Sequence, residues 1–125
     1  MKYLLDSNII IYHLNGENLA TEFLLKNKNQ CAISQITYIE VLSFPFTSEQ
    51  ESDVKAFLEN FKIIDVNRET AIQATKNRKI KKIKVPDNII ASTAQVNDLI
   101  LVTRNITDFN YLDIKLLNIF EIKQT

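Results

Sequence analysis

The sequence predicts an α/β protein whose largely parallel sheet is covered by helices on both faces. Short apolar runs alternate along the chain with longer stretches that repeat at the helical period, the pattern of successive βαβ units. The 125 residues contain only one glycine and two prolines, which argues against a turn-rich all-β fold and against long linkers. A chain of this length forms one domain with a real core, so we expect a single domain over residues 1–125.

The strands are predicted where apolar residues run together. The first run ends at Asp6 and the fourth ends at Thr103, so each of these two strands leads directly into a polar residue. The five predicted strands cover residues 2–5, 31–34, 62–66, 99–103 and 114–120.

The helices are predicted from apolar periodicity and from start and stop signals. The first stops near Gly16, Ser34 caps the third, and Pro45 ends it. Ser48, with Glu51 three residues later, has the spacing of a capping box at the start of the fourth. The six predicted helices cover residues 8–14, 19–26, 35–43, 48–61, 68–80 and 85–96.

The composition is that of an ordinary soluble globular protein. Hydrophobic residues make up 46% of the chain and charged residues 24%. No apolar run approaches the length of a membrane span, so no membrane association is expected. Cys31 is the only cysteine and cannot form an internal disulfide, which fits a reducing cytoplasm.

The formal net charge is zero, but the charges are unevenly spread. Residues 76–84, KNRKIKKIK, are strongly basic, while residues 49–53, EQESD, are acidic. The basic run has two interpretations. It is either a solvated helix end with the loop that follows, or a local patch that contacts phosphate groups.

Four acidic residues occupy positions where a carboxylate is unexpected. Asp6 and Asp108 follow predicted strands, Asp87 opens a helix after Pro86, and Glu40 is the only charged residue of an almost wholly apolar helix, which should therefore be buried. Each acid also has a structural interpretation. Asp6 and Asp87 would cap helices, Asp108 would be an exposed turn residue, and Glu40 would pair with a distant base.

The carboxyl ends of parallel strands form the functional edge of an open α/β sheet, where these acids would meet. Two carboxylates about 6 Å apart at an effective dielectric of about 20 repel by roughly 3 kcal/mol. Summed over four acids, the repulsion is on the order of 15 kcal/mol, comparable to the stability of a domain. Such a cluster must take up protons or bind a cation, and an all-oxygen site favours Mg²⁺ or Mn²⁺.

Four stretches together resemble the PIN domain, and more closely the VapC-type toxin ribonucleases of type II toxin–antitoxin pairs. These stretches are LLDSNIIIYHL, ISQITYIEVLSFP, KVPDNIIASTA and LVTRNITDF, in this order. The resemblance implies a three-layer α/β/α sandwich around a mostly parallel sheet. It also implies an endoribonuclease dependent on Mg²⁺ or Mn²⁺. The implied catalytic and metal-binding acids are Asp6, Glu40, Asp87 and Asp108, and the implied supporting polar residues are Asn8, Thr103 and Asn105.

The resemblance also implies partners and shows two departures. Proteins of this type act on RNA, pair with a small antitoxin and commonly form homodimers. The phenylalanines at 44, 46, 57 and 61 would be either simple core or a clamp for an antitoxin helix. Asn88 stands where family members often have alanine, and Asn97 where glycine is common.

Two other functional hypotheses remain open. A phosphatase of the haloacid dehalogenase type would also begin with a strand ending in aspartate, but it needs a second aspartate where this chain has Asn8. A PIN-like module that binds RNA or protein without catalysis is the other, and the presence of all four acids argues against it. A serine or cysteine hydrolase is disfavoured because His13, on the first helix, is the only histidine.

Overall fold

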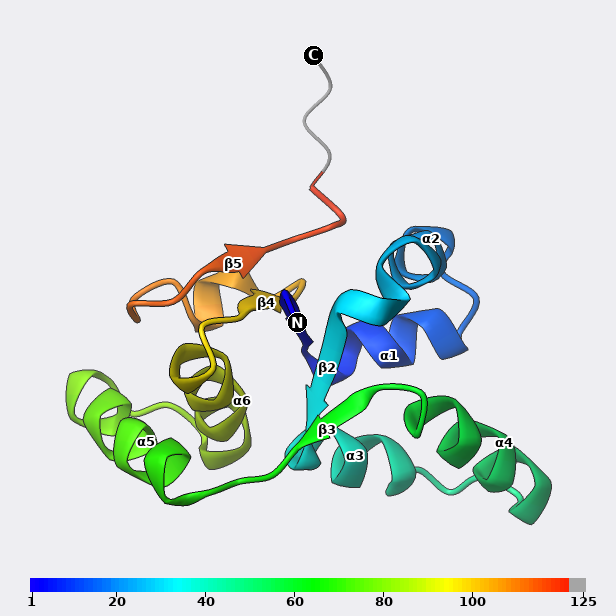
Figure 1. Ribbon diagram of the computed structural model, residues 1–125, viewed down its shortest axis with the longest axis horizontal. Helices are drawn as coiled ribbons and strands as arrows, with labels where there is room; N and C mark the ends of the chain where they lie inside the picture. Colours follow the sequence, from blue (N-terminus) through cyan, green and yellow to red (C-terminus); the bar gives the residue numbers. More distant parts are fainter. Residues whose placement is uncertain (122–125) are drawn as a thin grey trace.

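The computed structural model describes residues 1–121, in which five parallel strands form one sheet of order β3-β2-β1-β4-β5 (Figure 1). The strands are β1 (Tyr3–Leu5), β2 (Cys31–Ser34), β3 (Lys62–Ile64), β4 (Ile100–Val102) and β5 (Leu116–Leu117). All five were predicted, and the predicted parallel sheet is confirmed. The first strand lies at the centre, so the chain turns to opposite sides of β1 when it adds β2 and β4.

Within residues 1–121, six α-helices connect the strands, and all six were predicted to within a few residues. They are α1 (Ser7–Leu14), α2 (Asn18–Asn27), α3 (Gln35–Leu42), α4 (Ser48–Leu58), α5 (Arg68–Ile80) and α6 (Val85–Val96), with short 3-10 turns η1 (Lys28–Gln30) and η2 (Ile106–Asp108). None of the helices within residues 1–121 has the length and apolar character needed to span a membrane.

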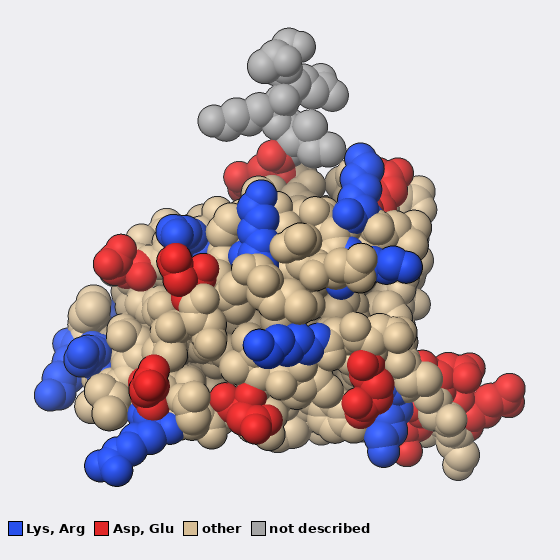
Figure 2. Space-filling model, viewed as in Figure 1, with Lys and Arg blue, Asp and Glu red and all other residues tan. Residues whose placement is uncertain are grey.

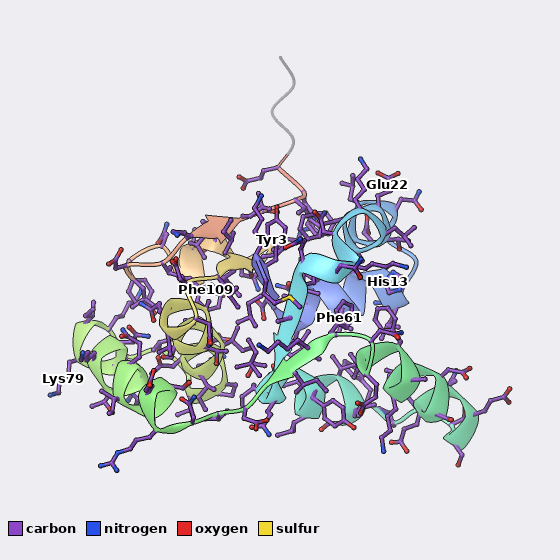
Figure 3. The ribbon with its side chains drawn as sticks, viewed as in Figure 1. Tyr3, His13, Glu22, Phe61, Lys79 and Phe109 are labelled. Atoms are coloured by element: carbon purple, nitrogen blue, oxygen red, sulfur yellow. The ribbon has the colours of Figure 1, made fainter. Side chains whose placement is uncertain are left out.

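The core has two halves because side chains alternate across the sheet. Leu5, Ile33 and Val102 point to the face covered by α1, α2, α3 and α4, whereas Leu4 and Leu101 point to the face covered by α6. In Figure 1, α5 and α6 lie on one side of the strands and α1 to α4 on the other, and Figure 3 shows Phe61 and Phe109 on these opposite sides. The three-layer α/β/α sandwich is thereby confirmed.

A buried polar network joins α5 to α6. Asn77 Nδ2 lies 3.1 Å from Asn88 Oδ1, 3.0 Å from Ser92 Oγ and 2.8 Å from Gln95 Oε1, and Asn88 Nδ2 donates to a main-chain carbonyl of α5 at 2.9 Å. The network explains why asparagine stands at 88, where the family often has alanine. It sets the position of α6, and with it the position of Asp87.

Three local predictions about α3 and α4 differ from the structure. The capping box of α4 uses Thr47 and Gln50, one residue before the predicted pair, because the Thr47 hydroxyl accepts from Gln50 N–H at 3.2 Å and the Gln50 side chain accepts from Thr47 N–H at 3.0 Å. Helix α4 ends at Leu58 rather than at 61. The prediction that α3 is buried is wrong for one side of the helix, because Ile39 is 58% exposed.

Two helix ends in the described part of the chain use left-handed backbone. Gly16, with φ +83°, follows α1 as predicted and closes it through a hydrogen bond from its N–H to the carbonyl of His13. After α6 the left-handed residue is Asp98, with φ 52°, whereas Asn97 has φ −96° and needs no glycine. The departure at Asn97 therefore causes no strain at that residue.

The phenylalanines resolve into core and surface. Phe61 is buried, and Phe46 and Phe57 pack against the same half of the core, while Phe44 is 47% exposed. Cys31 is buried and unpaired, as expected of a small core residue.

Candidate functional site

Asp6 lies at the carboxyl end of the central strand and is only 6% exposed. Its Oδ1 accepts a hydrogen bond from Ser7 N–H at 2.7 Å and makes Asp6 the N-cap of α1. Its Oδ2 accepts from the Thr103 hydroxyl, also at 2.7 Å, because the β1–β4 register places Leu5 beside Val102. The capping interpretation is confirmed, and it leaves a buried carboxylate at the edge where the sheet's strands end.

The surroundings of Asp6 disfavour its negative charge. Burial raises the pKa of Asp6, and the nearby carboxylates of Asp87 and Glu40 also raise it. The hydrogen bonds from Thr103 and Ser7 act in the opposite direction, and the pKa that results is about 6. A divalent cation would reverse this balance, because it would compensate a charge that the fold has removed from water.

Glu40 is tied to Asp6 through one serine. The Ser7 hydroxyl donates to Glu40 Oε1 at 2.6 Å and lies 3.1 Å from Thr37 Oγ1, one helical turn before Glu40 on α3. The alternative that Glu40 pairs with a distant base is wrong for the described residues, where the one ion pair joins Lys115 to Asp98.

Asp87 and Asp108 form the outer part of the acidic cluster. Asp87 lies in the first turn of α6 but does not cap it, because the N-cap position belongs to Lys84. Burial raises the pKa of Asp87, as do the charges of Asp108 and Glu40, whereas Lys84 lowers it. Asp108 is exposed on η2, as its turn interpretation predicted. The fold therefore brings Asp87 within electrostatic reach of each of the other three acids, and Asp6 within reach of Glu40.

Thr103 is the central polar residue of the site. Besides donating to Asp6, its oxygen accepts from the main-chain N–H of Asn105 at 3.1 Å and lies 3.5 Å from Asn8 Nδ2. Asn8 Oδ1 is buried and has no hydrogen-bond partner in the described part of the chain. An oxygen left in this state costs free energy unless a donor or a cation reaches it.

The oxygen atoms of these residues are suitable ligands for a hard cation, although the side chains are not arranged around a single metal position. The donors are all oxygens, and Asp6 and Asn8 both carry buried oxygen atoms that a cation would stabilise. Within residues 1–121, no three Asp, Glu, His or Cys side chains stand together as a metal-binding group. Coordination by several of the acids therefore requires side-chain rotation, most readily of the exposed Asp108 and the half-buried Asp87.

The basic run predicted from the sequence borders the acids. A cleft of about 210 Å³ is lined by Lys81, Lys82, Ile83, Lys84, Asp87, Thr107, Asp108 and Tyr111. Sequence reasoning did not single out Thr37 or Tyr111. Thr37 lies three residues before Glu40 on the same helix, and Tyr111 lies three residues after Asp108. This closeness to a candidate acid was the signal that could have identified each of them.

His13 has a packing role. Its ring stacks on Phe57 with centroids 4.9 Å apart, and its Nδ1 lies 2.8 Å from Thr21 Oγ1. Burial lowers the pKa of His13. These contacts place it in a second cleft of about 310 Å³ between α1, α2 and α4, which also contains Leu25 and Phe61.

Comparison with known proteins agrees with this architecture. Residues 3–115 match the PIN domain family. A protein named Ribonuclease VapC10 from Mycobacterium tuberculosis is 29% identical over 113 residues, which cover 85% of this chain and 84% of that protein. The sheet order, the acids at its edge and this match define the class, and the chain belongs to the PIN domain family.

Solved structures agree as well. A chain of the toxin–antitoxin complex from Klebsiella pneumoniae is 35% identical with a TM-score of 0.86, and the match covers 97% of this chain and 100% of that one. A chain of VapBC2 from Rickettsia felis, bound to a promoter DNA fragment, is 27% identical with a TM-score of 0.80, covering 94% and 98%. The predicted resemblance to VapC-type proteins is thereby confirmed.

Proposed function

We propose that this protein is a divalent-metal-dependent endoribonuclease, the toxin of a toxin–antitoxin pair. The observation that carries the proposal is Asp6, a buried carboxylate at the end of the central strand whose neighbours are further acids. The family match supports it, as do the names of the relatives, one a ribonuclease and another part of a toxin–antitoxin complex.

Asp6 and Asp87 would hold Mg²⁺ or Mn²⁺ most directly, with Glu40 and Asp108 contributing directly or through water. When bound, the cation would supply a Lewis acid that neutralises phosphate charge and lowers the pKa of water. Thr103 favours the ionised form of Asp6 by its hydrogen bond, and Ser7 orients Glu40. Asn8 and Asn105 would keep the surrounding polar loop in place.

The reaction would be hydrolysis of an RNA phosphodiester. A water oxygen forms a new bond to phosphorus, the bond to one ester oxygen breaks, and that oxygen leaves with a proton. The ionised carboxylates would orient the attacking water and accept its proton, so a lower pH that protonates Asp6 would slow the reaction.

The second cleft, between α1, α2 and α4, suits the antitoxin. Its walls include exposed Leu25 and the rings of Phe57 and Phe61, an apolar lining of the kind that receives one face of an amphipathic helix. Three of the phenylalanines thus belong to the core, and two of these also face the cleft. The antitoxin would be encoded by a short reading frame beside this gene, and the toxin would also form a homodimer.

The test is cleavage by purified protein freed of any partner. Labelled RNAs are incubated with Mg²⁺, with Mn²⁺ or with a chelator, using the parent and the variants Asp6→Asn and Asp87→Asn. We expect cleavage only with a divalent cation, and a loss of at least about 100-fold in each variant, since each would remove a ligand. Asp53→Asn, which removes an exposed carboxylate on α4, is the matched control and should cut like the parent.

Two outcomes would overturn the proposal. If folded Asp6→Asn and Asp87→Asn proteins cut as well as the parent, the acids are not the reactive site. If the parent binds RNA and never cuts it with either cation, the protein is a PIN-like binding module instead.

A further inference from the structure

The cleft beside Asp87 and Asp108 carries opposite charges on its two sides. Lys81, Lys82 and Lys84 line it together with the two acids and Tyr111. Carboxylates alone would repel a phosphate group, so any polyanion bound here needs positive charge nearby. The lysines supply that charge within the same cleft.

The lysine segment is held in place by its backbone. Lys81 N–H donates to the carbonyl of Asn77 at 3.2 Å, and Ile83 N–H donates to the carbonyl of Lys81 at 2.9 Å. Ile83 is 6% exposed and packs in the α6 half of the core, while Lys81, Lys82 and Lys84 are all exposed. The buried isoleucine thus anchors a short turn that presents lysines on either side of it.

Neither Lys81 nor Lys82 forms an ion pair with another described residue. Within residues 1–121 the single ion pair, Lys115 with Asp98, lies elsewhere. Lys81 Nζ instead lies 4.6 Å from the centre of the Tyr111 ring. Burial and the charges of Asp108 and Asp87 raise the pKa of the Tyr111 hydroxyl, which agrees with a ring close to both acids.

A cation close to the ring of a half-buried tyrosine is a combination that suits single-stranded nucleic acid. Lysines neutralise backbone phosphates, and an aromatic ring stacks with a base of any identity. Tyr111 is half-buried with its body packed on the core, so its ring is fixed before a nucleotide arrives. Double-stranded RNA would not present its bases to such a ring.

We propose that Lys81, Lys82 and Tyr111 form a binding subsite for the nucleotide next to the cleaved phosphodiester of single-stranded RNA. This inference rests on the proposed function, because it places the subsite beside the acids of the same site. The lysines contact phosphate, and Tyr111 stacks with the base. Lys84 acts on Asp87 instead, because its positive charge lowers the pKa of that carboxyl.

The first test measures binding without cleavage. A fluorescent single-stranded RNA of about 12 nucleotides is titrated with protein in a chelator, over salt from about 50 to about 200 mM. The variant Lys81→Gln/Lys82→Gln removes two phosphate contacts. Each phosphate contact contributes about 0.7 to the slope of log affinity against log salt concentration. At about 0.1 M salt, this slope corresponds to about 5-fold in affinity for each contact. We expect binding about 25-fold weaker and a slope shallower by about 1.4.

The matched control is Lys76→Gln/Lys79→Gln, which removes two exposed lysines from the same basic run. Neither lines the cleft, and Lys79 points outward from α5 (Figure 3). Figure 2 shows basic side chains on this outer side of the molecule, over α5, away from the acidic ones over α4. The control should bind RNA within about twofold of the parent. If both double variants lost the same amount of RNA affinity, the lysines would act only through a diffuse attraction between basic residues and RNA, and the proposed subsite would be wrong.

The ring is tested separately. Tyr111→Phe keeps the stacking surface and should bind like the parent, while Tyr111→Leu keeps apolar packing without the ring and should bind at least about 5-fold more weakly. In cleavage assays with Mg²⁺, the lysine and leucine variants should raise KM with little change in kcat. Equal binding by the leucine and phenylalanine variants would overturn the role of the ring.

Failure of the subsite and failure of the nuclease are distinguishable. A parent that never cuts RNA but loses binding in the lysine variant refutes the nuclease and keeps the subsite. A parent that cuts RNA while the lysine variant binds and cuts it equally well refutes the subsite and keeps the nuclease.

Discussion

Replacing Asp6 by asparagine should stabilise the metal-free protein while it abolishes activity. The folded pKa of Asp6 is about 6, above the ordinary value of 3.8 that it has in the unfolded chain. Between these values the folded state binds more protons, so the free energy of unfolding falls as pH rises through this window and the loss is complete above the folded pKa.

The magnitude follows from the shift. A rise from 3.8 to about 6 corresponds to about 3 kcal/mol, lost from the parent at neutral pH. Between pH about 4.5 and about 8 the accessible part is about 2 kcal/mol. Asparagine carries no charge and escapes this loss. It can still accept from Ser7 N–H, and the Thr103 hydroxyl can turn to accept from the new amide.

The assay is urea unfolding of the parent and Asp6→Asn at both pH values in a chelator. The variant's stability relative to the parent should rise by about 2 kcal/mol from the lower pH to the higher one. This comparison cancels any pH-independent effect of the substitution on packing. Asp53→Asn controls for the loss of one exposed negative charge.

Adding Mg²⁺ at neutral pH should act in the opposite direction. A cation at about 100 times its dissociation constant stabilises the parent by about 2.7 kcal/mol, and Asp6→Asn should gain far less. A relative stability of the variant that stays constant with pH would refute the argument that burial and neighbouring acids disfavour the Asp6 charge. Equal Mg²⁺ stabilisation of both proteins would remove Asp6 from the metal site.

Three further substitutions test separate parts of the structure. Thr103→Val removes the hydroxyl that donates to Asp6, so the pKa of Asp6 should rise further. The low-pH limb of the profile of cleavage rate against pH should therefore move to higher pH, and an unmoved limb would contradict this. Gly16→Ala should lower the free energy of unfolding in urea by about 1 kcal/mol, because φ is +83° at this residue while no atom lies within 4 Å of the added carbon. Gly16→Asn should lower it less, since asparagine tolerates this backbone conformation better than alanine. Equal losses in the two variants would argue against backbone strain. Leu58→Ala, at a fully buried side chain, should lose about 2–5 kcal/mol, whereas Leu25→Ala, at a side chain 70% exposed, should lose less than about 0.5 kcal/mol; similar losses would place the core elsewhere.

Local patterns determined the elements well. The ranges of α5 and α6 agree with the prediction at both ends, and Ser34 caps α3 as predicted. Helical periodicity, Pro86 near a helix start and Ser34 at a cap position are signals that a few neighbouring residues carry. The cap of α4 was misplaced because Thr47 and Ser48 have similar hydroxyls, and only the backbone conformation selects between them.

The burial of α3 was misjudged for a related reason. An almost wholly apolar helix predicts burial, but α3 leaves one side uncovered, and Ile39 on that side is exposed. Composition alone does not say how many layers cover a helix.

The strands and helices, in their order along the chain, could be predicted from the sequence, as could four acids whose positions needed an explanation. How these acids are connected depends on the folded arrangement. Ser7 reaches Glu40 across 33 residues and Thr103 reaches Asp6 across 97, because strand register and sheet order place distant segments side by side. Charge repulsion, burial and the lysine cleft beside Asp87 depend on these distances in space, which no local pattern in the chain encodes.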